Sequence, residues 1–320
     1  MSTAVRDLLS KEEIQQVTQR SDLQGAWAIA RTWLIIALTF TVLGLYPNPL
    51  TFVLAVFVIG GQQLALAILT HEATHRTLFK TRQLNDALAD WLCGRPIWLD
   101  VQRYREHHMR HHAHTGTDGD PDLSLVDPFP CSRWSMTRKL FRDLSGQTGL
   151  RRMLGLILMD AGQLKYTVAA EVEVLPRNGR SLWDYIRTAI KNFMPVLLSN
   201  LVIAAVLWAF GLLWAYSVWI VAYITTFSLY LRIRSIAEHA CTERVADFLR
   251  NTRTTRAGWL AKLTVAPMNV NYHLEHHLMA SVPFYRLPQF HKLLLERDAV
   301  VPAKGYVSVM RLASSDGGRV

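Results

Sequence analysis

The stretch from Leu50 to His75, LTFVLAVFVIGGQQLALAILTHEATH, joins a long apolar run to two histidines that are four residues apart. Roughly 20 residues, each rising about 1.5 Å along a helix, cross the hydrocarbon core of a membrane, which is about 30 Å thick. The segment from Leu50 to Leu69 has that length, and His71 follows it directly. The stretch therefore predicts a spanning helix that carries His71 and His75 on an extension beyond the bilayer.

Three further segments have the same apolar character. They run from Ala26 to Tyr46, from Pro195 to Leu213 and from Tyr216 to Leu231, and 50% of the 320 residues are apolar, which is high for a soluble protein. The turns within the two pairs, at Pro47-Asn48-Pro49 and around Trp214, are very short. We therefore predict an all-α integral membrane protein with four spanning helices in two hairpins, each returning to the side that it left.

The basic residues indicate which side that is. Neither turn contains any of the 35 Lys and Arg residues, which lie in the amino-terminal segment, the central region and the carboxy-terminal region. By the positive-inside rule these regions face the cytoplasm. The topology also accounts for the net charge of +10, so we expect no nucleic-acid partner.

We expect the chain to form a single domain, 1–320, because the two hairpins and the polar regions between them would together build one membrane-bound unit. We expect a cytoplasmic amino-terminal helix (1–24, with a capping box at Ser10 and Glu13), a first hairpin (26–69), a cytoplasmic or interfacial region (70–194), a second hairpin (195–231), a cytoplasmic cap (232–312) and a tail (313–320). Within the third of these regions, Trp91–Leu99 is too short to span and Leu144–Leu175 predicts one or two amphipathic helices. The isolated Cys93, Cys131 and Cys241 argue against disulfides and a Cys-type zinc site.

Histidines supply the strongest chemical signal. Eleven of the twelve fall into four short stretches: His71 and His75; His107, His108, His111, His112 and His114; His239; and His273, His276 and His277. Residues three and four apart share one face of a helix, so the spacing aims several imidazoles at one point. Neutral imidazole is a common ligand of zinc, copper, iron and nickel. The pattern predicts at least one metal ion and favours two.

Two enzyme classes fit part of this pattern. His71-Glu72-x-x-His75 matches the motif of zinc metalloproteases, in which Glu72 would be the general base. Three protein ligands complete such a zinc site, however, which leaves at least six clustered histidines without a role. Two redox-active irons would use all of them, whereas zinc has no accessible redox change. A histidine-lined metal transporter ranks last, because the four segments contain no histidine or carboxylate.

Taken together, His71-x-x-x-His75, His108-x-x-His111-His112 and His273-x-x-His276-His277 resemble the three histidine boxes of the integral-membrane fatty acid desaturase and hydroxylase family. The resemblance covers Leu64 to Leu295. It implies four spanning helices under a cytoplasmic cap that holds two irons, with O₂ as co-substrate. It also implies an additional ligand, which His239 fits. The implied metal ligands are therefore His71, His75, His108, His111, His112, His239, His273, His276 and His277, with no catalytic residue beyond them.

Several positions depart from the family pattern or lie outside the ligand set. Ser235 stands where the acyl-CoA branch has an Asn that approaches a metal through water. No His-Pro-Gly-Gly haem motif occurs, so electrons must come from a separate donor of the ferredoxin, rubredoxin or cytochrome b5 type. His107 could replace His108 as a ligand by its spacing, but the resemblance places it outside the ligand set. Asp118–Asp122 is predicted as a turn, and His114 and His291 are not expected to be ligands.

The resemblance implies a membrane enzyme that oxidises a lipid or fatty acyl chain. Desaturation is the first expectation, since it is the commonest outcome among relatives. Hydroxylation, ketolation or oxidative decarboxylation of a fatty acid to a terminal alkene could use the same ligands.

Overall fold

A computed structural model describes residues 8–169 and 171–315 of the chain. The described residues form helices joined by turns and loops, with only two isolated β-bridges. The helices are α2 (Lys11–Val17), α3 (Asp22–Leu45), α4 (Pro49–Thr74), η1 (Leu84–Leu88), η2 (Asp90–Gly94), η3 (Arg95–Ile97), α5 (Val101–His114), α6 (Leu123–Val126), α7 (Arg133–Leu144), α8 (Gln147–Asp160), α9 (Leu182–Ala209), η4 (Leu213–Ala215), α10 (Tyr216–Ile224), α11 (Thr226–His239), α12 (Phe248–Asn251), α13 (Trp259–Leu263), η5 (Pro267–Asn269), α14 (His273–Leu278), α15 (Leu287–Leu295) and α16 (Tyr306–Ala313).

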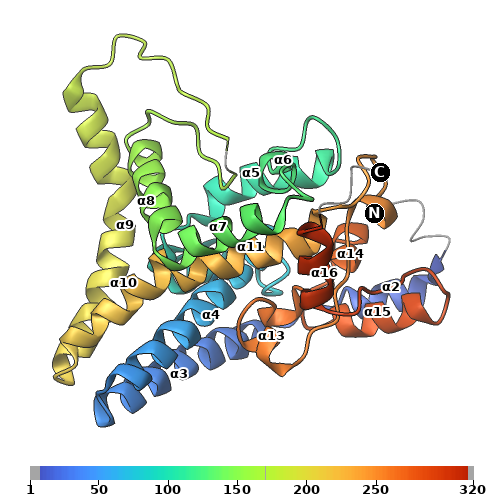
Figure 1. The fold of residues 1–320 in the computed structure, drawn as a ribbon, viewed down its shortest axis with the longest axis horizontal. Helices are drawn as coiled ribbons and strands as arrows, with labels where there is room; N and C mark the ends of the chain where they lie inside the picture. The colour runs from blue at the N-terminus through green and yellow to red at the C-terminus, as the bar shows by residue number, and fades with distance from the viewer. Residues whose placement is uncertain (1–7, 170, 316–320) are drawn as a thin grey trace.

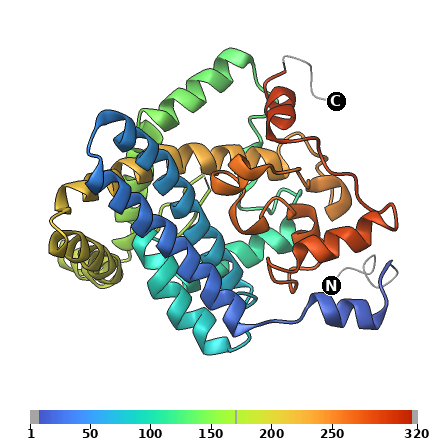
Figure 2. The ribbon, with the colours of Figure 1, turned by 90° about the horizontal axis from the view of Figure 1, so that it is seen from below.

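Among the described residues, four helical stretches are long and apolar enough to cross a membrane: Lys11–Leu45, Pro49–Thr74, Leu182–Ala209 and Leu213–His239. They contain two of the predicted spanning segments and nearly all of the other two, which extend past Leu45 and Ala209 by one and four residues, so this part of the fold prediction is confirmed. Figure 1 shows that the α3–α4 turn and the α9–α10 turn lie together at the lower left, while α14, α15 and α16 lie at the other end. Figure 2 shows the same separation from below.

The first hairpin is formed by α3 and α4. Asn48 caps α4 by accepting hydrogen bonds from the backbone N–H groups of Leu50 and Thr51, and Pro49 occupies the first helical position. Proline is well suited to that position because its missing N–H would have no helical partner there. The Pro47-Asn48-Pro49 turn therefore ends one helix and starts the next within a few residues.

Helix α4 is the central helix of the bundle. It packs against α3, α5, α10 and α11, and every residue from Ile59 to Thr74 is buried. Two adjacent glycines permit this close packing. A methyl group on Gly60 would lie 2.1 Å from Thr226 Oγ1, and one on Gly61 would lie 2.2 Å from the carbonyl oxygen of Leu263. Small residues at such contacts let helix backbones approach closely.

The second hairpin differs from the expected segments at both of its helices. Helix α9 begins at Leu182, well before Pro195, which lies inside it. The last spanning stretch is not one straight helix, because Thr225 (φ −111°, ψ −87°) separates α10 from α11. Helix α11 then continues to His239, beyond the predicted end at Leu231.

Helix α8 packs against this break. The Arg152 guanidinium donates to the Tyr223 carbonyl at 2.6 Å and to Ser228 Oγ at 3.0 Å, so it bridges the two sides of Thr225. Gly149 permits the contact, because a methyl group there would lie 2.2 Å from the Ile224 carbonyl oxygen. Contacts from α8 therefore stabilise the break between α10 and α11.

The connecting regions match the sequence-based expectations in part. The capping box of Ser10 and Glu13 is present at the start of α2. Trp91–Leu99 includes most of η2 and all of η3 and extends two residues past Ile97, and its Cys93 and Ile97 are buried. The expectation for Leu144–Leu175 was wrong in its second half, since α8 ends at Asp160 and the described residues that follow, 161–169 and 171–175, form turns and a bridge between Leu164 and Val174 rather than a helix. Of the predicted tail, residues 316–320 lie outside the described part of the chain.

Candidate metal centre

The first two predicted ligands lie at the end of α4. His71 is in its last turn and His75 is its C-cap, so both imidazoles lie on one side of the helix, with ring centroids 4.9 Å apart. Arg105 of α5 holds this end in place. Its guanidinium donates to the carbonyl oxygens of Ala73 and Thr74, each at 2.9 Å, and pairs with Asp86 at 2.6 Å. Capping the last carbonyls in this way joins the first histidine box to the second.

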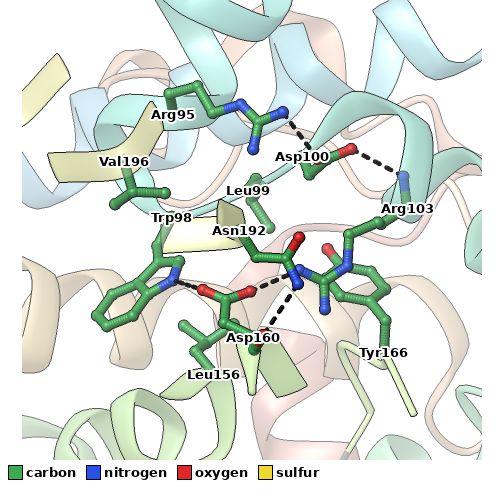
Figure 3. Close-up of a pocket in the computed structure, with 10 residues that line it drawn as sticks. All are labelled: Arg95, Trp98, Leu99, Asp100, Arg103, Leu156, Asp160, Tyr166, Asn192 and Val196. Carbon is green, nitrogen blue, oxygen red and sulfur yellow. Dashed lines mark hydrogen bonds and ion pairs between the residues drawn. The ribbon is translucent and has the colours of Figure 1, made fainter. Parts of the chain in front are cut away.

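The second group of ligands is carried by α5. Asp100 caps the helix by accepting from the N–H groups of Gln102 and Arg103. The start of α5 is also tied to α8 and α9 through Asp160, as Figure 3 shows. The Asp160 carboxylate accepts from Trp98 Nε1 at 2.8 Å and from Arg103 Nη1 at 2.5 Å, and its carbonyl accepts from Asn192. The space among these side chains is about 10 Å³, enough for one water molecule and too small for a lipid.

The remaining predicted ligands come from the other half of the chain. His239 is the last residue of α11, and His273, His276 and His277 lie in α14. Figure 1 shows the end of α11 next to α14. His239 Nε2 and His273 Nε2 are 2.8 Å apart, which places the two helices in direct contact.

The nine predicted ligand histidines come together in two groups, and within each group one nitrogen per residue lies within 4.8 Å of all the others. The five-histidine group contains His71, His75, His108, His112 and His276. The four-histidine group contains His111, His239, His273 and His277. Helix α5 contributes to both groups, and so does α14, so the two groups share their supporting helices.

The spacing of the nitrogens fits bound metal ions. Two nitrogens at right angles around an ion, with bonds of about 2.1 Å, lie about 3 Å apart. The closest Nε2 pairs have that separation: His75–His108 at 2.9 Å, His108–His112 at 3.0 Å, His112–His276 at 3.0 Å, His239–His273 at 2.8 Å and His273–His277 at 3.1 Å. Both ring nitrogens of His71 are buried, and neither has a hydrogen-bond partner in the part of the chain that the structure describes. Buried nitrogens of this kind need a partner, and a metal ion would supply it.

The protonation of these histidines also suits metal binding. Burial, and then the charge of neighbouring groups, lowers the pKa of His75 to about 3. The same causes hold the pKa values of five others well below the ordinary value: His108, His112, His273, His276 and His277. These imidazoles are therefore uncharged at neutral pH, and each keeps a lone pair for a metal.

His111 differs from the other histidines of α5. Burial by itself would lower its pKa, but the hydrogen bond to Asp120 and the negative charges of Asp122 and Asp120 outweigh that effect and raise the pKa. His111 Nδ1 lies 2.8 Å from Asp120 Oδ1. This carboxylate fixes the ring so that Nε2 faces the four-histidine group.

The predicted turn Asp118–Asp122 is a turn, yet two of its carboxylates reach the site. Asp120 binds His111, and Asp122 Oδ1 lies 2.7 Å from His107 Nε2. Sequence reasoning missed this role, because Asp120 follows the end of α5 and has no periodic relation to His111. His107 belongs to neither histidine group, which agrees with its expected place outside the ligand set.

Other carboxylates next to the ligands have fixed partners. Glu72 Oε2 accepts from Thr77 Oγ1 at 2.9 Å and from the Phe284 N–H at 3.0 Å. Glu275 accepts from Thr254 and from His291 Nδ1, the latter at 2.6 Å. His291 is therefore a hydrogen-bonded histidine, as expected. A general base must be free to take a proton from water, and Glu72 is buried with its carboxylate engaged in structural hydrogen bonds.

Comparison with known proteins gives a consistent result. The sequence model of one family, described as "Fatty acid desaturase", matches residues 45–307. Dihydrorhizobitoxine desaturase of Bradyrhizobium elkanii is 27% identical over 321 residues, covering 97% of this chain and 84% of that protein. The sn-1 oleoyl-lipid 12-desaturase of Anabaena variabilis is 23% identical over 275 residues, covering 82% and 70%. A beta-carotene ketolase of Paracoccus sp. (strain PC1) is 33% identical over 112 residues, covering 33% and 44%. The matched range 45–307 includes both histidine groups.

Proposed function

The chain belongs to the fatty acid desaturase family, and on this premise we propose that it desaturates a lipid alkyl or acyl chain with two iron ions, O₂ and electrons from a separate protein. As a member of this family it is a lipid oxidoreductase. The observation that carries the finer proposal is the gathering of nine histidines into two groups beside the end of an apolar helix. A zinc protease is not supported, since it would use three ligands and leave the rest of both groups without a role.

The proposed reaction balances as follows. Two hydrogens leave adjacent carbons and a carbon–carbon double bond forms. O₂ is reduced to two water molecules by four electrons, two from the substrate and two from the donor protein, with two protons taken up. Bound iron in a nitrogen-rich shell would supply the one-electron redox chemistry that an unactivated C–H bond requires and that zinc lacks.

The residues of the chain provide the surroundings for this chemistry. The nine histidines would hold the two irons, in one group of five and one group of four. Six of the nine are buried, and this burial limits the access of water, which strengthens electrostatic contacts and limits side reactions. The Tyr104 ring packs against His108, with centroids 5.4 Å apart, and restricts the movement of that imidazole. His71 directly continues the apolar part of α4, so we infer that a long alkyl chain would enter from the bilayer and that its position would select the carbon that reacts.

Desaturation is proposed ahead of ketolation because of the extent of the similarity. The two desaturases match 97% and 82% of this chain, whereas the ketolase match covers 33% of it. From the positive-inside rule we infer that the metal centre and both termini lie on the cytoplasmic side. A ferredoxin, rubredoxin or cytochrome b5 type of donor would then approach from the cytoplasm.

Two measurements test the proposal. Metal analysis of detergent-purified protein should find about two irons per chain, and mass spectrometry of lipids from expressing cells should find chains lighter by two hydrogens. The His75→Ala variant should lack the product, because it removes a ligand of the five-histidine group. A single tightly bound zinc, or lipid products that each carry one added oxygen, would contradict the metal or the reaction, respectively.

A further inference from the structure

The two histidine groups differ in what holds the ring nitrogens that face away from the proposed metal. In the four-histidine group, three of the four Nδ1 atoms have a hydrogen-bond partner. These contacts are His111 to Asp120 Oδ1 at 2.8 Å, His239 to the Asn251 carbonyl at 3.2 Å and His277 to Thr115 Oγ1 at 3.4 Å. The fourth, His273 Nδ1, lies 3.4 Å from Glu238 Oε1 but has no hydrogen bond among the described residues, so Asp120 is the one carboxylate hydrogen-bonded to a histidine of this group.

The five-histidine group has no such support among the described residues. His276 Nδ1 and both nitrogens of His71 are buried without a hydrogen bond. The nearest carboxylate is Glu72, whose Oε1 is 3.5 Å from His71 Nδ1 but whose hydrogen bonds go elsewhere. The hydrogen-bond contacts of His75, His108 and His112 join them only to other histidines.

The Asp120 contact is built into the fold. Asp120 is 9% exposed, and its Oδ1 also accepts from the Asp122 N–H at 2.9 Å. Asp122 is held in turn by His107 Nε2 at 2.7 Å. His107 and His111 both lie in α5, so one helix holds the loop at two points. By contrast, Asp118 in the same turn is exposed.

A carboxylate on the outer nitrogen of a ligand histidine fixes the orientation of the ring and makes it a stronger donor to the metal. The loss of such a partner typically weakens metal binding about 10- to 100-fold. We propose that Asp120, through His111, is a positioning residue for the four-histidine position alone, so that the two metal positions have unequal and separately adjustable affinities. This inference rests on the metal centre of the proposed function.

Helix α5 makes the proposal sharply testable. His111 belongs to the four-histidine group, while His108 and His112 belong to the five-histidine group. A variant that merely loosened α5 would weaken both metal positions. A variant that acts through His111 should weaken only one of them.

The experiment uses full-length protein in detergent, stripped of metal and titrated with Co²⁺, whose visible absorption reports each bound equivalent. Asp120→Asn should bind one of two equivalents about 10- to 100-fold more weakly and leave the other unchanged. The matched control Asp118→Asn removes a carboxylate from the same turn and should bind both equivalents like the unaltered chain. Equal weakening of both equivalents by Asp120→Asn, or no weakening, overturns the proposal.

A second measurement does not depend on how well the variant folds. Unaltered protein reconstituted with ⁵⁷Fe should give two different iron signals by Mössbauer spectroscopy, and they should be lost at different rates to a chelator. One signal with a single rate would overturn the inference of unequal positions. Failure to bind two metals at all would instead contradict the proposed function, so the two failures are distinguishable.

Discussion

At the scale of single residues, Glu72 separates the two enzyme classes that its sequence motif permits. The motif by itself allows Glu72 to be the general base of a protease. The structure places its carboxylate between Thr77 and the backbone of Phe284, where it connects the first histidine box to the segment before α15. Its role in the fold is therefore structural, and its neighbours His71 and His75 face the three other imidazoles of the five-histidine group.

The Glu72→Gln variant should accordingly retain about two irons per chain. A glutamine side chain has the same length and keeps an oxygen that can accept from Phe284. Lipid oxidation should fall by no more than about tenfold, whereas a protease that lost its general base would lose about 10²- to 10⁴-fold. Metal analysis and product analysis on the same preparation measure both effects. Abolished oxidation with iron fully retained would show that Glu72 has a chemical role.

At the scale of helices, the break between α10 and α11 is supported by α8 rather than by a local signal. No proline or glycine occurs from Tyr216 to His239. Arg152 instead binds both sides of the break, and its guanidinium carbon lies 4.5 Å from the centre of the Tyr223 ring and 4.8 Å from that of Phe227. Since α11 carries His239, the packing of α8 helps to direct a predicted ligand toward α14.

Two glycines of α8 allow this packing to be tested. In Gly149→Ala the new methyl group would meet the Ile224 carbonyl oxygen at 2.2 Å, which we expect to destabilise the protein by about 1–3 kcal/mol. In Gly155→Ala the nearest atom is Met159 Cε at 4.0 Å, so alanine should be neutral or stabilise by up to about 1 kcal/mol. Thermal unfolding in detergent compares the two variants. Equal melting temperatures would contradict the importance of this contact.

At the scale of the whole molecule, the metal centre joins parts of the chain that are far apart in sequence. Its histidines lie in α5, α11 and α14 and at the end of α4. The hydrophobic core runs through the same helices, and buried Leu69 and Leu274 lie close to the ligands in sequence. Bound metal would therefore stabilise the folded state, because the unfolded chain cannot bring these imidazoles together.

Removing metal with a chelator should lower the melting temperature. Metal at 100 to 1,000 times its dissociation constant contributes about 3–4 kcal/mol per site, which corresponds to about 5–15 °C for a chain of this size. Zinc should restore the melting temperature but not the lipid oxidation, since it has no redox change. The His75→Ala variant should respond less to the chelator. An unchanged melting temperature after complete metal removal would contradict the stabilising role.

The orientation in the membrane can be tested with single cysteines in a chain that lacks Cys93, Cys131 and Cys241. Pro47 lies in the first hairpin turn, and the exposed Lys292 lies on α15 at the opposite end of the molecule, so each is replaced by cysteine. A maleimide that cannot cross membranes should label Pro47→Cys on intact bacterial cells and Lys292→Cys only after permeabilisation. The reverse pattern would place the metal centre outside the cytoplasm.

Features that depend on local periodicity could be predicted from the sequence alone. Apolar length predicted the spanning helices, and the spacing of the histidines predicted which imidazoles share a helix face. These inferences succeed because a helix relates neighbours three and four apart whatever surrounds it. The sequence also indicated the family, because three spaced histidine motifs around two membrane hairpins are a specific combination.

The folded structure was needed to show how α5 divides its histidines between the two groups, which carboxylate supports His111, and where the last spanning stretch breaks. Each of these depends on contacts between residues that are separated by a turn or by most of the chain, such as Asp120 with His111 or Arg152 with Tyr223. No periodic pattern relates such residues. Their proximity is set by the packing of helices, which minimises exposed apolar surface and unpaired polar groups over the whole molecule at once.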